Sequence, residues 1–106
     1  MRNNYKVPWH VRQYVKRELM DYDKNLKLLD ECQGNTRGLL LISKRLTKIS
    51  NVIERLNEDD REAAEIIFFL KYSQAGAEIA KGISKSAYYN AMNKIIYLTA
   101  KELELI

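Results

Sequence analysis

The clearest periodic signal in the sequence lies in residues 39–56, LLLISKRLTKISNVIERL. Apolar residues recur there in alternating steps of three and four, which places them on one face of an α-helix. The basic residues fall outside that stripe, so we expect a helix with one apolar and one basic face. The stripe consists of Leu39, Ile42, Leu46, Ile49, Ile53 and Leu56, widened by Val52, and the basic residues are Lys44, Arg45, Lys48 and Arg55.

The residues before this stretch predict another long helix. Pro8 suits the first position of a helix, and the helical pattern continues to about Cys32. The segment Gly34-Asn35-Thr36-Arg37-Gly38 then breaks the helix. Because the connection is short, we expect an antiparallel helical hairpin, with Trp9 as a packing anchor. The apolar positions of this helix are Val15, Leu19, Tyr22, Leu26 and Leu29.

The C-terminal half predicts three more helices. A third helix should begin after a cap at Asn57 or Asp59 and run to about Tyr72. A short helix should follow from about Gln74 to Lys81, and a last helix should run from a cap at Ser84 to about Leu103. No strand pattern is visible, so the predicted fold is all-α. We expect a hairpin in residues 1–56, which could serve oligomerisation, and a second helical unit in residues 57–106.

Composition and charge indicate a small soluble protein. The 106 residues are 46% hydrophobic, and their formal net charge is +4. The apolar runs are too short to span a bilayer, so no membrane partner is expected. The lone Cys32 excludes an intramolecular disulfide and a multi-cysteine zinc site, and it fits a cytoplasmic location. No acidic residue occurs between Ile79 and Lys101, as a surface that faces phosphates requires.

The sequence offers no set of catalytic residues. His10 has no partner in the sequence that would make it a base or a metal ligand. Cys32 is interpreted as a small apolar residue. The acids of residues 58–62 lie at a helix start, where they interact favourably with the helix dipole. We therefore predict a protein that is not an enzyme and has no cofactor, metal or catalytic site.

The segment Ala77–Asn90, AEIAKGISKSAYYN, has the features of a helix-turn-helix. Ile79 and Ala80 offer an apolar contact and a small residue where two helices must approach closely. Gly82 can adopt the positive φ of a tight turn, and Ile83 can fill the junction. The last helix should then face the domain with Ala87, Tyr88, Ala91, Met92 and Ile95.

The exposed side of this last helix is the predicted DNA-binding site. A recognition helix enters the major groove with its N-terminal part, where asparagine can read adenine and lysine can contact guanine or phosphate. The predicted partner is therefore double-stranded DNA. The candidate DNA-binding residues are Lys81, Ser84, Lys85, Ser86, Tyr89, Asn90, Asn93 and Lys94.

Three stretches of the chain resemble phage transcriptional regulators of the RinA/ArpU kind. They are residues 7–25, residues 64–72 and the segment from Glu78 to Tyr89, with its basic and apolar tail. One departure is that only Lys81 separates Ile79-Ala80 from Gly82, where the usual pattern has several residues. The resemblance implies a C-terminal half like region 4 of sigma factors. It also implies a transcriptional regulator that binds DNA sequence-specifically and controls phage genes.

Two other functions fit the same residues. One is the DNA-recognising small subunit of a phage terminase. The other is a helical adaptor that binds RNA polymerase or a sigma factor without reading DNA. The stripe of residues 39–56 could be the seam of a homodimer or could pack within the chain. Lys44, Arg45 and Lys48 could contact phosphates or could form a solvated basic face.

Overall fold

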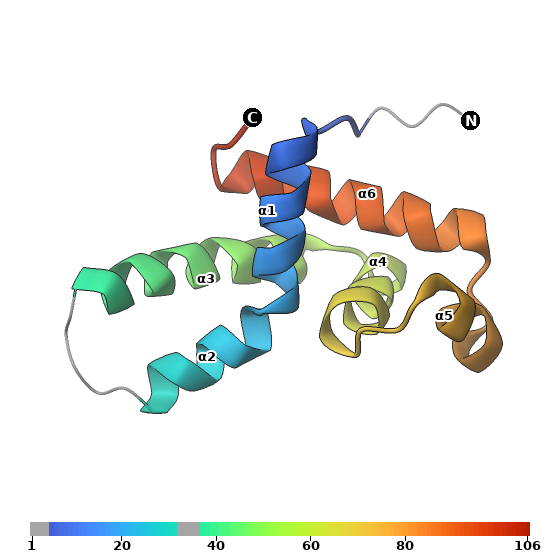
Figure 1. The fold of residues 1–106 in the computed structure, drawn as a ribbon, viewed down its shortest axis with the longest axis horizontal. Helices are drawn as coiled ribbons and strands as arrows, with labels where there is room; N and C mark the ends of the chain where they lie inside the picture. The colour runs from blue at the N-terminus through green and yellow to red at the C-terminus, as the bar shows by residue number, and fades with distance from the viewer. Residues whose placement is uncertain (1–4, 32–36) are drawn as a thin grey trace.

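The computed structural model describes residues 5–31 and 37–106, and for residues 37–39 it describes the backbone only. This part of the chain contains helices and no strand, so the prediction of an all-α fold is confirmed. The elements in chain order are α1 (Trp9–Met20), α2 (Tyr22–Glu31), α3 (Arg37–Arg55), α4 (Glu58–Ala64), the π-helical turn η1 (Glu65–Phe69), α5 (Gln74–Lys81) and α6 (Lys85–Glu102) (Figure 1).

The core forms around α6, which packs against α1, α3, α4 and α5 (Figure 1). α1 crosses the molecule and also contacts η1. One buried cluster therefore includes residues from both the N-terminal and the C-terminal half. Among its members are Val15 and Leu19 of α1, Ile49 of α3, Ile67 and Phe68 of η1, and Ile95 and Ile96 of α6.

The prediction of one helix from Pro8 to Cys32 was wrong, because the helix bends at Asp21. Asp21 has φ −91° and ψ 3°, and its amide still donates to the carbonyl of Arg17. The two arms pack against different partners: α1 places Val15 and Leu19 in the core, whereas α2 lies on α3 and has no buried residue. The predicted helix end at Cys32 and most of the predicted break lie in residues 32–36, outside the described residues.

The N-terminal hairpin is formed by α2 and α3, which lie side by side in Figure 1. α1 is not part of it, because it crosses over the core instead. From Leu46 onward, the predicted apolar stripe on α3 packs within the chain, whereas Ile42 is only partly buried. Its buried residues are Leu46, Ile49, Val52 and Leu56, with Ile53 partly buried.

The predicted third helix begins as expected but changes its winding at Glu65. The side chain of Asn57 caps α4 by accepting a hydrogen bond of 2.8 Å from the amide of Asp60. After Ala64 the chain widens into η1, where the amide of Leu70 donates to the carbonyl of Glu65. A wider turn brings successive side chains closer together around the helix. Three consecutive residues, Ile66, Ile67 and Phe68, are therefore buried together.

The interpretation of Trp9 as a packing anchor was wrong. Its side chain is 74% exposed at the first residue of α1. The apolar contacts at this end of the chain come instead from Val11, which is buried, and from Val7, which packs against the core. Spacing along the chain alone could not show which of these neighbouring apolar residues faces the core.

Candidate nucleic-acid interface

α5 and α6 are joined by a tight turn, and residues close to it in the sequence cap both helices. Ser73 caps α5 by accepting a hydrogen bond from the amide of Gly76, and Ser84 caps α6 by accepting one of 3.1 Å from the amide of Ala87. Gly82 ends α5 with φ 70°, in the left-handed region where a Cβ atom is unfavourable. The predicted cap at Ser84 and the predicted positive φ at Gly82 are confirmed.

The predicted contact through Ile79 and Ala80 was wrong. Ile79 is 88% exposed and Ala80 is also exposed, whereas Ala77 is fully buried against the core. The turn begins directly after Lys81, so α5 is short and meets α6 through the face that carries Ala77. The small residue required at the close approach is present, but it is Ala77, three positions before the predicted Ala80.

The inward face of α6 largely follows the predicted pattern. Tyr88, Met92 and Ile95 are buried, and Ala91 packs against the core from a partly buried position. Ala87 was predicted to face inward but is exposed. It lies in the first turn of the helix, where Lys85 and Ser86 are exposed as well. The start of α6 is therefore available to solvent on several sides.

The candidate DNA-binding residues divide into an exposed group and a partly buried pair. Ser86, Asn90 and Asn93 follow each other in steps of four and three, so they share one face of α6. Lys85 and Tyr89 lie one turn apart on the adjoining face. Lys81, Ser84, Lys85, Ser86, Tyr89 and Asn90 are exposed, whereas Asn93 and Lys94 are partly buried.

Tyr72 contacts residues of both α5 and α6, although the sequence analysis did not identify it as a functional residue. Its carbonyl accepts a hydrogen bond of 2.7 Å from the hydroxyl of Tyr88, and the ammonium of Lys81 lies 5.9 Å from the centre of its ring. Tyr88 packs edge-on against Tyr89 at 5.2 Å. Burial raises the pKa of Tyr88, so its hydroxyl stays protonated and can donate. Tyr89 therefore packs against a buried, hydrogen-bonded neighbour while it stays exposed near the start of α6.

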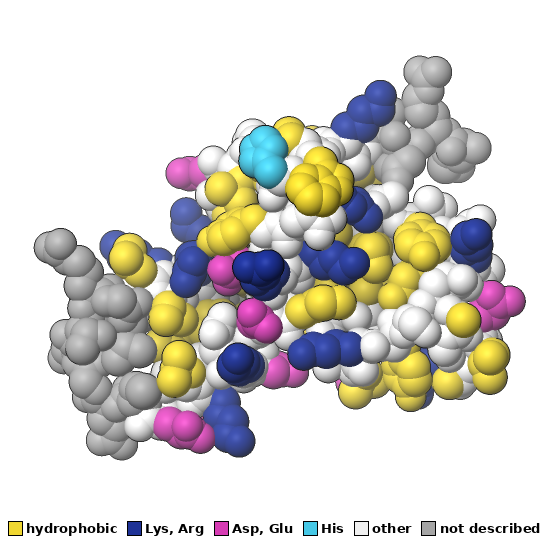
Figure 2. Space-filling model, viewed as in Figure 1, with side chains coloured by type: hydrophobic (Ala, Val, Ile, Leu, Met, Phe, Trp, Pro, Cys, Tyr) yellow, Lys and Arg dark blue, Asp and Glu magenta, His cyan; other side chains and the backbone are white. Residues whose placement is uncertain are grey.

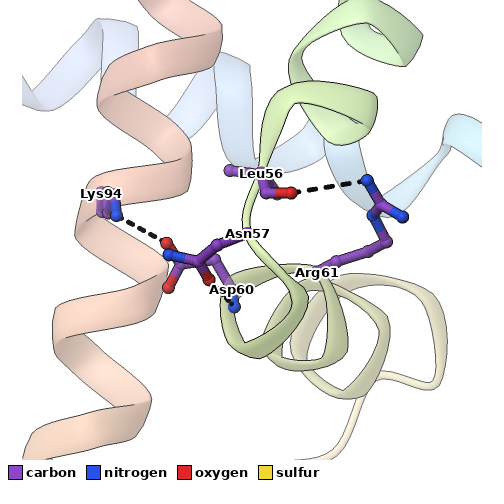
Figure 3. Close-up of polar contacts among 5 residues, drawn as sticks. All are labelled: Leu56, Asn57, Asp60, Arg61 and Lys94. Atoms are coloured by element: carbon purple, nitrogen blue, oxygen red, sulfur yellow. Dashed lines mark hydrogen bonds and ion pairs between the residues drawn. The ribbon is translucent and has the colours of Figure 1, made fainter.

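Lys94 is tied to α4 by an ion pair (Figure 3). Its ammonium lies 2.6 Å from a carboxylate oxygen of Asp60, and the side chains are 32% and 17% exposed. The hydrogen bond to Asp60 raises the pKa of Lys94. On the other side of α4, Arg61 donates to the carbonyl of Leu56. Lys94 therefore joins two helices, and its charge is already balanced.

Two of the four basic residues that flank the predicted apolar stripe on α3 are also paired. Arg45 donates to the hydroxyl of Tyr14 at 3.1 Å and to a carboxylate oxygen of Glu18 at 3.3 Å. Arg55 forms an ion pair of 2.8 Å with Glu102 near the end of α6. No ion pair involves Lys44 or Lys48 within the described residues. The basic face of α3 thus presents two lysines with unbalanced charge.

The remaining candidates were not expected to carry chemistry. His10 is exposed on α1, and Cys32 lies outside the described residues. Within residues 5–31 and 37–106, no group of three or more His, Cys, Asp or Glu side chains could hold a metal ion. No helix in the same ranges is long and apolar enough to cross a bilayer. Comparisons with models of protein families, with curated proteins and with solved structures found no match for this chain.

Proposed function

We propose that this protein is a sequence-specific DNA-binding regulator of transcription that places the start of α6 in the major groove. The observation that carries the proposal is the exposed start of α6, where Lys85, Ser86, Tyr89 and Asn90 are open to solvent. An α-helix fits the width of the major groove, and these side chains can bond to base edges or to phosphates. Phage genes as the target follow from the resemblance of the sequence alone.

The charges around the turn support the same orientation. Lys81 and Lys85 lie on the two sides of the turn and are exposed, so they can neutralise phosphates and fix the position of the helix. Ser86, Tyr89, Asn90 and Asn93 would then meet the bases. In this proposal Lys94 joins α6 to α4 and does not contact DNA, because Asp60 already balances its charge. The DNA contact would therefore be confined to the first turns of α6.

The test is selection from a pool of random duplex DNA at about physiological salt, followed by sequencing. We expect an enriched motif with the unaltered protein and none with the double variant Lys85→Ala/Asn90→Ala. The matched control is Lys27→Ala/Asn51→Ala, which removes the same residue types from exposed positions on α2 and α3. Each phosphate contact that is lost should lower the slope of log affinity against log salt by about 0.9.

The outcomes distinguish the proposal from its alternatives. A palindromic motif would indicate a dimer on two half-sites. A large ring on a sizing column would favour a small terminase subunit. No enrichment, with weak binding that Lys85→Ala/Asn90→Ala leaves unchanged, would overturn the proposal and favour an adaptor that binds RNA polymerase or a sigma factor.

A further inference from the structure

A groove lies between α1, α3 and two residues that follow α6, Leu103 and Leu105. None of its lining residues belongs to the turn between α5 and α6. Its volume is about 570 Å³, within the range of roughly 300–1,000 Å³ that ligand sites occupy. Most of its lining is apolar. The apolar lining residues are Tyr14, Leu41, Ile42, Leu103 and Leu105.

Large apolar side chains remain open to solvent in and beside this groove. Leu41 is 57% exposed and Leu105 is 39% exposed, and their chain neighbours Leu40 and Ile106 are exposed as well. In Figure 2 hydrophobic side chains lie among Lys and Arg, with some Asp and Glu, over the region of α1 and α3. Contiguous exposed apolar surface with a polar rim is typical of a site that binds another protein.

The rim of the groove is basic. Lys44, Arg45 and Lys48 line it from α3, at helical spacings that put them on the same side as Leu41. Arg45 is held in place by Tyr14 and by Glu18, the one acid that is paired there. Lys44 and Lys48 have no ion-pair partner among the described residues. The groove therefore combines an apolar floor with excess positive charge.

We propose that this groove binds an acidic amphipathic helix of another protein, with leucines on the face that enters the groove. Leu41 and Lys48 are seven residues apart, which is about 10 Å along α3. That length matches two turns of a bound helix with anchors at positions i, i+3, i+4 and i+7. Acidic residues beside the leucines would meet Lys44 and Lys48, and charge complementarity of this kind selects the partner.

Two other occupants fit the groove less well. A DNA backbone presents mainly charged phosphates, so it would leave Leu41 and Leu105 poorly covered. A second copy in a two-fold contact would place this face against itself, so that two surfaces with excess positive charge would meet. The proposal does not depend on DNA binding by α6, because none of the groove residues belongs to the turn or to the start of α6.

The test uses synthetic fluorescent helices about four turns long, added to the full chain while fluorescence anisotropy is measured. The probes carry leucine at the anchor spacing, glutamate beside the leucines and the helix-forming residue alanine at the remaining positions. We expect saturable binding that Lys44→Glu/Lys48→Glu weakens about tenfold, equivalent to about 1.4 kcal/mol. The matched control is Lys24→Glu/Lys27→Glu, the same change at exposed positions on α2, which should leave the affinity unchanged.

Three results would overturn the proposal. The first is no binding of the acidic leucine helices to the unaltered protein. The second is equal binding of a helix with the same composition but with its leucines spread around its circumference. The third is self-association in sedimentation that Leu41→Asn abolishes, which would show that a second copy covers the groove. Failure of DNA selection would leave this result unaffected, so the two proposals fail separately.

Discussion

Thr99 is fully buried in α6, yet its hydroxyl has no hydrogen-bond partner within the described residues. A buried polar group without a partner destabilises the folded state, because water solvates it in the unfolded chain. We expect Thr99→Val, which keeps the branched shape, to raise the free energy of unfolding by about 1 kcal/mol. Urea denaturation would measure the change. Thr99→Ala is the control and should lower stability through the space it leaves.

The ion pair between Lys94 and Asp60 should make stability depend on pH in the alkaline range. Its hydrogen bond raises the pKa of Lys94 in the folded protein. A raised pKa adds stability that is fully present below the ordinary lysine pKa of about 10.4 and is lost as pH rises through the folded value. We expect Lys94→Met to lower the free energy of unfolding by about 1 kcal/mol near pH 7.

The measurement is urea denaturation at several pH values from neutral to strongly alkaline. The difference between the unaltered protein and Lys94→Met should shrink as Lys94 loses its proton. The raised pKa of Tyr88 also removes stability in this range, but both proteins contain Tyr88, so the difference isolates the ion pair. A difference that stays constant with pH would contradict the assignment.

At the scale of the element, α5 offers a direct comparison between two of its residues. Ala77 is fully buried and Ile79 is 88% exposed. We expect Ala77→Leu to destabilise the fold by about 1–3 kcal/mol, because the larger side chain forces α5 away from the core. Ile79→Ser should change the free energy of unfolding by less than about 0.5 kcal/mol. If urea denaturation showed a larger loss of stability for Ile79→Ser than for Ala77→Leu, Ile79 would be the helix contact that the sequence predicted.

Local chemistry explains which elements could be predicted from the sequence. The caps at Asn57 and Ser84 and the left-handed Gly82 depend on residues within a few positions, so the starts of α4 and α6 and the turn were predicted. Ser73 carries the same signal and was missed. The bend at Asp21 and the burial of Ala77 depend on which surface lies opposite in three dimensions, and spacing along the chain holds no such information.

At the scale of the whole molecule, the two halves of the sequence share one core. Val11, Val15 and Leu19 of α1 belong to the same buried cluster as residues of η1 and α6. We expect a fragment of residues 57–106 to lack a cooperative thermal transition in circular dichroism, because its apolar surface would lose the cover of α1 and α3. The full chain is the control. A sharp transition in the fragment would show that residues 57–106 fold as an independent domain.

The difference between the buried and the exposed side of α6 also limits how descendants of this protein can diverge. One side of the helix contributes Tyr88, Met92, Ile95, Ile96 and Ala100 to the interior, where only substitutions of similar volume are tolerated. The opposite side can change with little effect on folding. After gene duplication, variation should therefore accumulate at the first outward positions, Lys85, Ser86 and Asn90, while the inner side drifts slowly. Under the proposed DNA-binding function, sequence preference would then evolve without a new scaffold.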